Sequence, residues 1–217
     1  MLISHKYKFI FFKSIKTASS SVFEFFTPYC LPDEENFKHE NYLDLSHIGF
    51  YKTGIVGDPN SNSKYNKMHV RCQRVKKVLD EINKKIWRKY FKFSVVRNPW
   101  DLCVSRYFWH KANNKPYNFE QMIKMLSTGL IPARKDLYQM NDNYICDYYI
   151  KYENLLDDIK TVCEKCNIKK YDLNNLTNQK SNYRDHSISY REYYNSELKD
   201  IVARVYADDI KKFNYSF

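Results

Sequence analysis

The chain has 217 residues, which fits one α/β domain or at most two small ones. Hydrophobic residues make up 43% of it, which argues against wholesale disorder, and only 4 Gly and 6 Pro argue against a loop-rich or fibrous protein. The 36 Lys and Arg against 25 Asp and Glu give a net charge of +11, which favours anionic partners, although an ordinary solvated lysine-rich surface gives the same number.

Strands and helices alternate along the first part of the chain. Residues 7–12 are apolar and aromatic and predict a buried strand, and residues 22–26 predict a helix after a short polar loop. Residues 27–67 are punctuated by Gly and Pro and are expected to be irregular, with substrate-binding elements among them. Apolar residues at helical spacing then predict one helix from residue 70 to about residue 90.

The second part continues the alternation. Strands are predicted at 91–96 and 146–150, and helices at 99–109, 119–126, 155–166 and 190–213. Asn98 fits an N-cap, Pro99 the first helical position and Asp101 the first turn of its helix. The alternation predicts an α/β fold of three layers, with a central, mostly parallel sheet flanked by helices, as a single domain over 1–217.

A polar loop between the first strand and its helix is the first candidate site. Its residues are Lys16, Thr17, Ala18, Ser19, Ser20 and Ser21. Backbone N–H groups at a helix start favour an anion, hydroxyls add donors and Lys16 adds a positive charge. The loop lacks the Gly-Lys pair of a nucleoside-triphosphate loop, which disfavours magnesium-dependent kinase chemistry. An ordinary serine-rich helix start would read the same way.

A second candidate follows the strand at 91–96. Arg97 ends that strand beside another helix start, where a guanidinium can grip a phosphate with two hydrogen bonds. Ser105 lies further along the same predicted helix, where its hydroxyl could reach the same phosphate. Either residue alone is common in proteins, but the pair together with the first loop is an unusual combination.

These two segments resemble the glycan-type sulfotransferases. The loop from Lys16 is similar to that family's 5′-phosphosulfate loop, which often reads P-K-T-[AG]-[ST]-[ST]-[ST], although Ile15 stands where the family usually has Pro. In a second possible alignment the loop motif begins at Lys13 and Ser14, which resembles the Lys-Ser start of this motif in the cytosolic sulfotransferases. The segment FSVVRNPWDLCVSRY looks like the family's 3′-phosphate segment, and the stretches KYENL and FNY resemble two further family motifs.

The resemblance implies a P-loop-like fold and the transfer of a sulfuryl group from 3′-phosphoadenosine 5′-phosphosulfate, with 3′-phosphoadenosine 5′-phosphate as product and no metal. Lys16 would stabilise the leaving group, and Arg97 and Ser105 would hold the 3′-phosphate. His69, ahead of the predicted helix, would be the base, with His47 and His186 as weaker candidates. Lys180 and Arg184 are candidate phosphate contacts in a basic loop. The acceptor implied is a carbohydrate hydroxyl.

Two other functions stay open. A small P-loop-type kinase would need magnesium and a nucleoside triphosphate, and a nucleic-acid-binding module would use the net charge without any recognised motif. The six cysteines are scattered: Cys163 and Cys166 are close in sequence but have no second pair to complete a zinc site. No signal peptide or membrane anchor is recognised, so a cytoplasmic location without a transmembrane segment is expected, or a Golgi-type lumen if an anchor has been removed.

Overall fold

The computed structural model describes residues 1–33, 48–57, 74–176, 184 and 187–217. These residues form two compact units. Unit 1 combines residues 1–96 and 135–179, and unit 2 combines residues 97–134 and 180–217. The expectation of one domain over 1–217 stays a prediction. None of the helices in the described part of the chain combines the length and the apolarity that a bilayer crossing needs.

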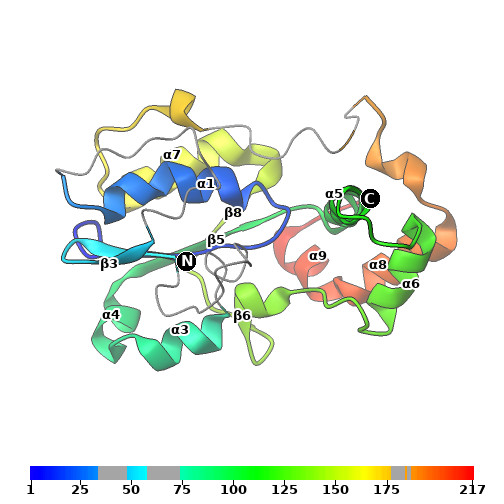
Figure 1. The fold of residues 1–217 in the computed structure, drawn as a ribbon, viewed down its shortest axis with the longest axis horizontal. Helices are drawn as coiled ribbons and strands as arrows, with labels where there is room; N and C mark the ends of the chain where they lie inside the picture. Colours follow the sequence, from blue (N-terminus) through cyan, green and yellow to red (C-terminus); the bar gives the residue numbers. More distant parts are fainter. Residues whose placement is uncertain (34–47, 58–73, 177–183, 185–186) are drawn as a thin grey trace. The chain divides into compact units, whose positions relative to one another are not determined.

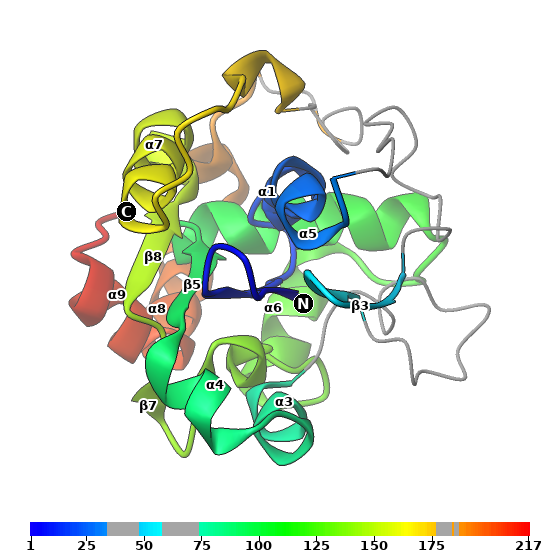
Figure 2. The ribbon, with the colours of Figure 1, turned by 90° about the vertical axis from the view of Figure 1, so that its left-hand side faces the viewer.

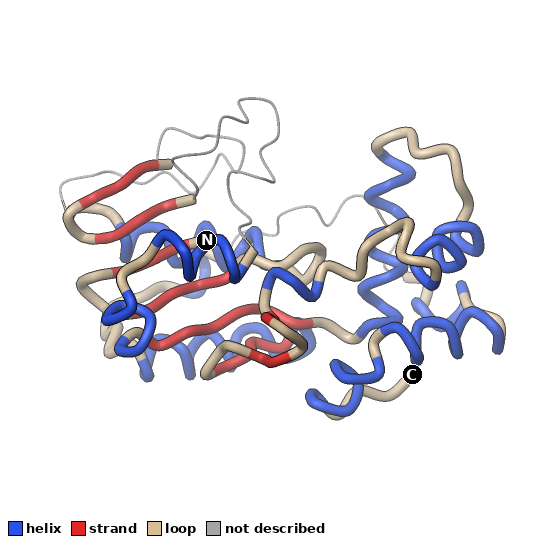
Figure 3. Tube along the Cα trace, turned by 90° about the horizontal axis from the view of Figure 1, so that it is seen from below, coloured by secondary structure: helices blue, strands red, loops and turns tan. Residues whose placement is uncertain are grey.

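Unit 1 is built on a six-stranded sheet with the order β3-β4-β1-β2-β5-β8. Its strands are β1 (Leu2–Ser4), β2 (Phe9–Phe12), β3 (Gly49–Tyr51), β4 (Gly54–Val56), β5 (Phe91–Val96) and β8 (Tyr148–Lys151). A separate two-stranded ribbon joins β6 (Gln139–Met140) to β7 (Asn143–Tyr144). Figure 3 shows these strands in red.

The sheet is mixed, so the expectation of a mostly parallel sheet holds for one half only. Strands β2, β5 and β8 pair in parallel, with Phe11 opposite Phe93 and Val95 opposite Ile150. Strand β1 pairs antiparallel with both β2 and β4, and β3 pairs antiparallel with β4. The α/β class is correct, whereas the antiparallel strands β1, β3 and β4 were not predicted.

Helices cover both faces of this sheet. Alternate residues of β2 enter different cores: Phe9 and Phe11 pack with α1 (Ser19–Phe26) and α7 (Leu155–Lys165), whereas Ile10 and Phe12 pack with α3 (Val75–Glu81) and α4 (Lys84–Lys89). The period of two places successive side chains on opposite faces. Figures 1 and 2 show α1 and α7 on one side of the sheet and α3 and α4 on the other.

The predicted helix 70–90 is two helices. Ile82 has an extended backbone (ψ 150°), and the side chain of Asn83 accepts a hydrogen bond from the backbone N–H of Lys85. Asn83 therefore caps a new helix, α4. Ile82 and Ile86 both pack on the core that Val75 and Val78 enter, so the apolar pattern continues across the break.

All the regular secondary structure in the described part of unit 2 is helical. It contains α5 (Pro99–Ala112), α6 (Phe119–Ser127), the 3₁₀ turn η6 (Tyr190–Tyr193), α8 (Ser196–Val205) and α9 (Ala207–Phe213). The predicted helix 190–213 is thus three elements, and Asn195 caps the second by accepting a hydrogen bond from the N–H of Leu198. A single core joins buried residues of α5, α6 and α8, among them Trp100, Met122 and Val202.

The remaining described segments are short 3₁₀ turns of unit 1. They are η1 (Thr27–Cys30), η2 (Lys135–Leu137), η3 (Tyr152–Asn154) and η4 (Leu173–Asn175). Turn η3 connects β8 to α7, so strands β2, β5 and β8 each run into a helix at their carboxyl ends.

Candidate functional site

The loop between β2 and α1 has an unusual backbone. Lys16 (φ 60°) and Ala18 (φ 61°, ψ 9°) are both left-handed, and Ala18 is the N-cap residue of α1. A left-handed residue other than Gly costs about 1–2 kcal/mol. Two such residues within three positions wind the chain tightly, and turns of this kind point successive N–H groups into an anion-binding concavity.

Ser14 holds this loop in place. Its hydroxyl donates to the carbonyl oxygen of Val95 at 2.6 Å and lies 2.6 Å from Thr17 Oγ1, and its own carbonyl oxygen accepts from the Ser19 hydroxyl. Ser14 and Thr17 are buried. The loop is therefore tied to strand β5 near its carboxyl end, two residues before Arg97 in the chain.

These hydrogen bonds determine which hydroxyl groups of the loop are used within the loop itself. Ser14 donates its single proton to Val95, so the contact with Thr17 uses the proton of the Thr17 hydroxyl, and Ser19 spends its proton on Ser14. Ser20 and Ser21 are buried in α1, whereas Lys16 is only half-buried. The hydroxyls of Thr17 and Ser19 thus build the loop, and its backbone N–H groups and Lys16 provide the positive potential.

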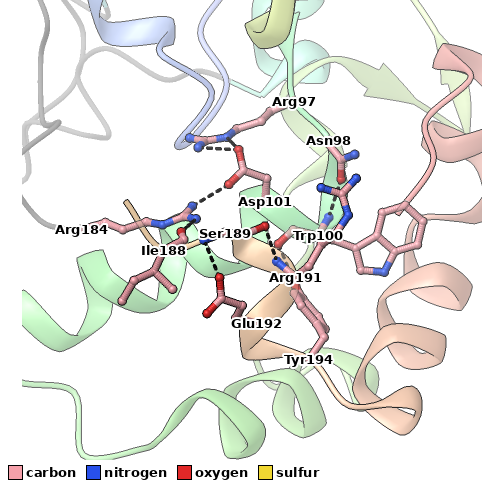
Figure 4. Close-up of polar contacts among 10 residues, drawn as sticks. All are labelled: Arg97, Asn98, Trp100, Asp101, Arg184, Ile188, Ser189, Arg191, Glu192 and Tyr194. Atoms are coloured by element: carbon pink, nitrogen blue, oxygen red, sulfur yellow. Dashed lines mark hydrogen bonds and ion pairs between the residues drawn. The ribbon is translucent and has the colours of Figure 1, made fainter. Parts of the chain in front are cut away.

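Arg97 lies between β5 and α5, where the sequence placed it. Asn98 caps α5 by accepting from the N–H of Trp100, and its own amide donates to the carbonyl of Ser216. The Arg97 guanidinium makes two bonds to one oxygen of Asp101, with Nε at 2.7 Å and a terminal nitrogen at 2.6 Å from Oδ2 (Figure 4). Arg97 and Asp101 are 6% and 14% exposed, so this pair is largely screened from water.

Asp101 also binds Arg184. Its second oxygen, Oδ1, lies 2.6 Å from a terminal nitrogen of Arg184, and the other terminal nitrogen donates to the carbonyl of Ile188. Figure 4 shows the Asp101 carboxylate between the two guanidinium groups. Arg184 is 9% exposed, and its Nε–H has no hydrogen-bond acceptor among the described residues. The cluster carries a net charge of +1 and one unused buried donor.

Ser105 follows Asp101 by four residues on α5 and is half-buried. Residues four apart share one face of a helix, so Asp101 and Ser105 lie on the same face. The structure thus brings Arg97, Asp101 and Arg184 into direct contact, and Ser105 lies on the same face of α5 as Asp101.

Several predicted residues lie outside the part of the chain that the structure describes. They are His47, His69, Lys180 and His186. The roles expected of His69 as a base and of Lys180 as a phosphate contact therefore stay predictions.

The described cysteines are not reactive thiols. Burial raises the pKa of Cys103, Cys163 and Cys166 to about 12 in each case, and Cys163 is inside the core of unit 1. Thiols with such pKa values stay protonated at neutral pH, which suits packing and not nucleophilic chemistry. No group of three His, Cys, Asp or Glu residues that could hold a metal occurs within the described ranges.

Sequence reasoning missed two residues of these sites. The sequence indicates Ser14 only as part of a second possible alignment of the loop motif, and Asp101 only as a favourable charge in the first helical turn. The spacing of four between Arg97 and Asp101 is a signal for an ion pair near a helix start. The contact between Asp101 and Arg184 spans 83 residues and has no local signal.

Comparisons with known proteins give one relationship. No family model matches the chain. No solved structure matches it. An uncharacterized protein of Archaeoglobus fulgidus is 32% identical over 115 residues, which are 49% of this chain and 93% of the archaeal protein. The chain therefore belongs to the same family as this archaeal protein.

Proposed function

We propose that the chain is a sulfotransferase that uses 3′-phosphoadenosine 5′-phosphosulfate as donor. The observation that carries the proposal is the junction of β2 and α1, where left-handed Lys16 and Ala18 lead into the start of a helix. Such a junction suits a phosphate-type anion because N–H groups and the helix dipole converge there. It also supports a P-loop-like fold, together with the parallel strands β2, β5 and β8.

Each predicted donor contact has a chemical reason. The loop from Lys16 to Ser21 holds the 5′-phosphosulfate through its backbone and the Lys16 ammonium. Arg97 and Ser105 hold the 3′-phosphate, for which a guanidinium is suited because it donates two parallel hydrogen bonds. Arg184 adds positive charge to the same group of residues, since Asp101 neutralises only one of the two arginines.

The reaction is an in-line displacement at sulfur. The acceptor hydroxyl loses its proton to a base, for which His69 is the candidate, and its oxygen bonds to sulfur as the sulfur–oxygen bond to the 5′-phosphate breaks. Lys16 stabilises the negative charge that grows on the departing phosphate oxygen. The resemblance to glycan-type enzymes makes a carbohydrate hydroxyl the proposed acceptor.

Ligand-dependent thermal unfolding tests the proposal. The melting temperature is measured with 3′-phosphoadenosine 5′-phosphate, with adenosine 5′-phosphate, and with ATP plus magnesium. A ligand at 100 times its dissociation constant stabilises the folded state by about 2.7 kcal/mol. We expect the bisphosphate to raise the melting temperature by several degrees and the other two nucleotides to have much smaller effects.

Other results would redirect the assignment. Stabilisation by ATP with magnesium and not by the bisphosphate would overturn the sulfotransferase proposal in favour of a kinase. Equal, steeply salt-dependent stabilisation by the bisphosphate and by unrelated oligonucleotides would indicate a nucleic-acid-binding protein.

A further inference from the structure

Asp101 is an acidic residue in the middle of a site proposed to bind an anion. By charge alone it should repel a phosphate, because like charges disfavour each other at close range. Yet its carboxylate contacts both Arg97 and Arg184. Its presence therefore needs a reason other than charge.

The contacts of Asp101 supply that reason. Each oxygen serves a different arginine: Oδ2 takes two bonds from Arg97, and Oδ1 takes one from Arg184. All three side chains are at least largely buried, so they are held with little freedom. The carboxylate sits on α5, which Asn98 caps and the core of unit 2 anchors.

Arg184 shows which direction is left for a ligand. One terminal nitrogen is bound to Asp101 and the other to the carbonyl of Ile188, so two of its three nitrogens are fixed. The guanidinium carbon also lies 5.9 Å from the centre of the Tyr193 ring. The remaining donor, Nε–H, is buried and has no acceptor in the described part of the chain. Buried donors are almost always paired, so an unused one indicates a missing acceptor such as an ion.

We infer that Asp101 is a positioning residue for the phosphate site: it fixes Arg97 and Arg184 in one cluster of net charge +1 and orients Arg184 so that Nε–H meets an oxygen of the bound phosphate. The inference rests on the proposed function, because the phosphate it concerns is the 3′-phosphate of the donor nucleotide. The arginines are held in position before the ligand arrives, so binding does not have to order two long side chains.

The inference and the charge argument predict opposite signs for Asp101→Asn. Removing a negative charge should tighten the binding of an anion, whereas losing the positioning group should weaken it. We expect the dissociation constant of 3′-phosphoadenosine 5′-phosphate to rise by about tenfold or more, as for a lost hydrogen bond to a charged group. Adenosine 5′-phosphate lacks the 3′-phosphate that these arginines are proposed to bind. We therefore expect its dissociation constant for Asp101→Asn to stay within about twofold of its value for the unmodified protein.

Isothermal titration of both nucleotides measures this selectivity, with two further variants. Asp200→Asn removes the same charge from an exposed position of α8 in the same unit and should leave the selectivity unchanged. Asp101→Glu keeps the negative charge but displaces the carboxylate by one methylene. Because the charge is kept, this variant should stay folded even if Asp101→Asn unfolds. It should lower the preference for the bisphosphate by a smaller factor than Asp101→Asn.

The outcomes separate the inference from the proposed function. Unmodified protein without a preference for the bisphosphate would overturn both. Unmodified protein with that preference, retained or increased in folded Asp101→Asn or retained in full in Asp101→Glu, would overturn the positioning role alone. In a double-mutant cycle, Asp101→Asn combined with Arg184→Gln should cost less than the sum of the two changes, because one acts through the other. Additive losses would contradict the inference.

Discussion

Two residues of the loop after β2 adopt a conformation that their side chains disfavour. Lys16 and Ala18 are left-handed although neither is Gly. Strained backbone of this kind persists only where surrounding contacts hold it, and it occurs often at ligand-binding sites. Here Ser14 supplies the holding contacts to Thr17, Ser19 and Val95. This geometry could not be predicted from the sequence, because left-handed positions are usually occupied by Gly and neither Lys16 nor Ala18 is Gly.

Lys16 and Ala18 offer a matched pair of substitutions. Lys16→Ala keeps a β-carbon at a left-handed position and removes the ammonium together with the chain that carries it. Loss of one group that stabilises transition-state charge costs about 10²–10³ in turnover, so we expect sulfuryl transfer to fall by about that factor while the melting temperature changes little. Turnover is measured with the donor nucleotide and a carbohydrate acceptor, and unfolding by circular dichroism.

Ala18→Gly is the control for that measurement. Relief of a left-handed β-carbon is worth about 1–2 kcal/mol, whereas Gly costs about 0.4–1 kcal/mol in unfolded-chain entropy. We therefore expect a net gain of about 0.8 kcal/mol in the free energy of unfolding, from the midpoints of these two ranges, and retained turnover. Full activity in Lys16→Ala would remove Lys16 from the mechanism.

Residue-level prediction succeeded where the signal is local. Asn98, Pro99 and Asp101 hold the helix-start positions that their chemistry suits. Arg97 lies at the end of β5, as expected. The ion pair of Arg184 with Asp101 could not be predicted from the sequence, because a contact between residues far apart in the chain depends on how the whole chain folds.

At the scale of elements, helix breaks were the main error. The apolar period runs through Ile82 and Ile86 without interruption because both side chains enter one core. The spacing of apolar residues in a sequence indicates which side chains face the core. It does not indicate whether the backbone between them stays helical. Asn83 and Asn195 were the available signals, since Asn is a favoured N-cap residue and each caps a helix here.

The hairpin of β3 and β4 was not predicted either. Its strand β4 requires a glycine at position 54, because a larger residue would collide with neighbouring backbone. A β-carbon at Gly54 would lie 2.2 Å from the carbonyl oxygen of Ile3 and 2.8 Å from that of Cys30. Both are backbone atoms, so they cannot move aside cheaply. At Gly49, in the partner strand, the nearest atoms are 3.3 Å away and belong to the flexible Tyr51 side chain.

Gly54→Ala and Gly49→Ala therefore form a second matched pair. We expect Gly54→Ala to lower the free energy of unfolding by about 2 kcal/mol or more, in the range of overpacked sites. We expect Gly49→Ala to change it by less than about 0.5 kcal/mol, because the end of the Tyr51 side chain can shift by a few tenths of an ångström. Urea titration followed by circular dichroism measures both. Equal effects of the two substitutions would contradict the close approach of β4 to Ile3.

At the scale of the whole molecule, buried thiols in both units link stability to pH. Burial raises the pKa of Cys103 in unit 2 and of Cys163 in unit 1 to about 12, above the ordinary value of 9.0. Between these values the unfolded chain loses the thiol proton and the folded chain keeps it. Stability from this source is complete below pH 9 and is lost as pH rises toward 12.

Denaturation at a series of pH values tests this dependence. We expect the free energy of unfolding to fall above pH 9, by up to about 1.4 kcal/mol per pH unit for a fully buried thiol. Cys103→Ala should make the fall less steep, whatever its effect at neutral pH. A free energy that stays level between pH 9 and pH 11 would contradict the burial of these groups.

The overall class of the fold could be predicted because strands and helices alternate in the sequence. The direction of the strands could not. Strand β1 has three residues, and β3 and β4 have three each, too few for a period to stand out. Their pairing depends on contacts such as that of Leu2 with both Phe11 and Val56, which no local pattern encodes.

The path of the chain has a consequence for its synthesis. Each unit combines two separate segments, so the chain passes from one unit to the other after residues 96, 134 and 179. On the ribosome, helix α5 emerges with Trp100 and Val104 well before α8, which supplies their buried partners Leu198 and Val202. Strand β5 likewise leaves the ribosome before β8, the strand that pairs with it in parallel. Unit 1 cannot finish folding until residues 135–179 have been made, and unit 2 cannot finish until residues 180–217 have been made. Both units therefore pass through a stage with exposed apolar surface, where chaperones act.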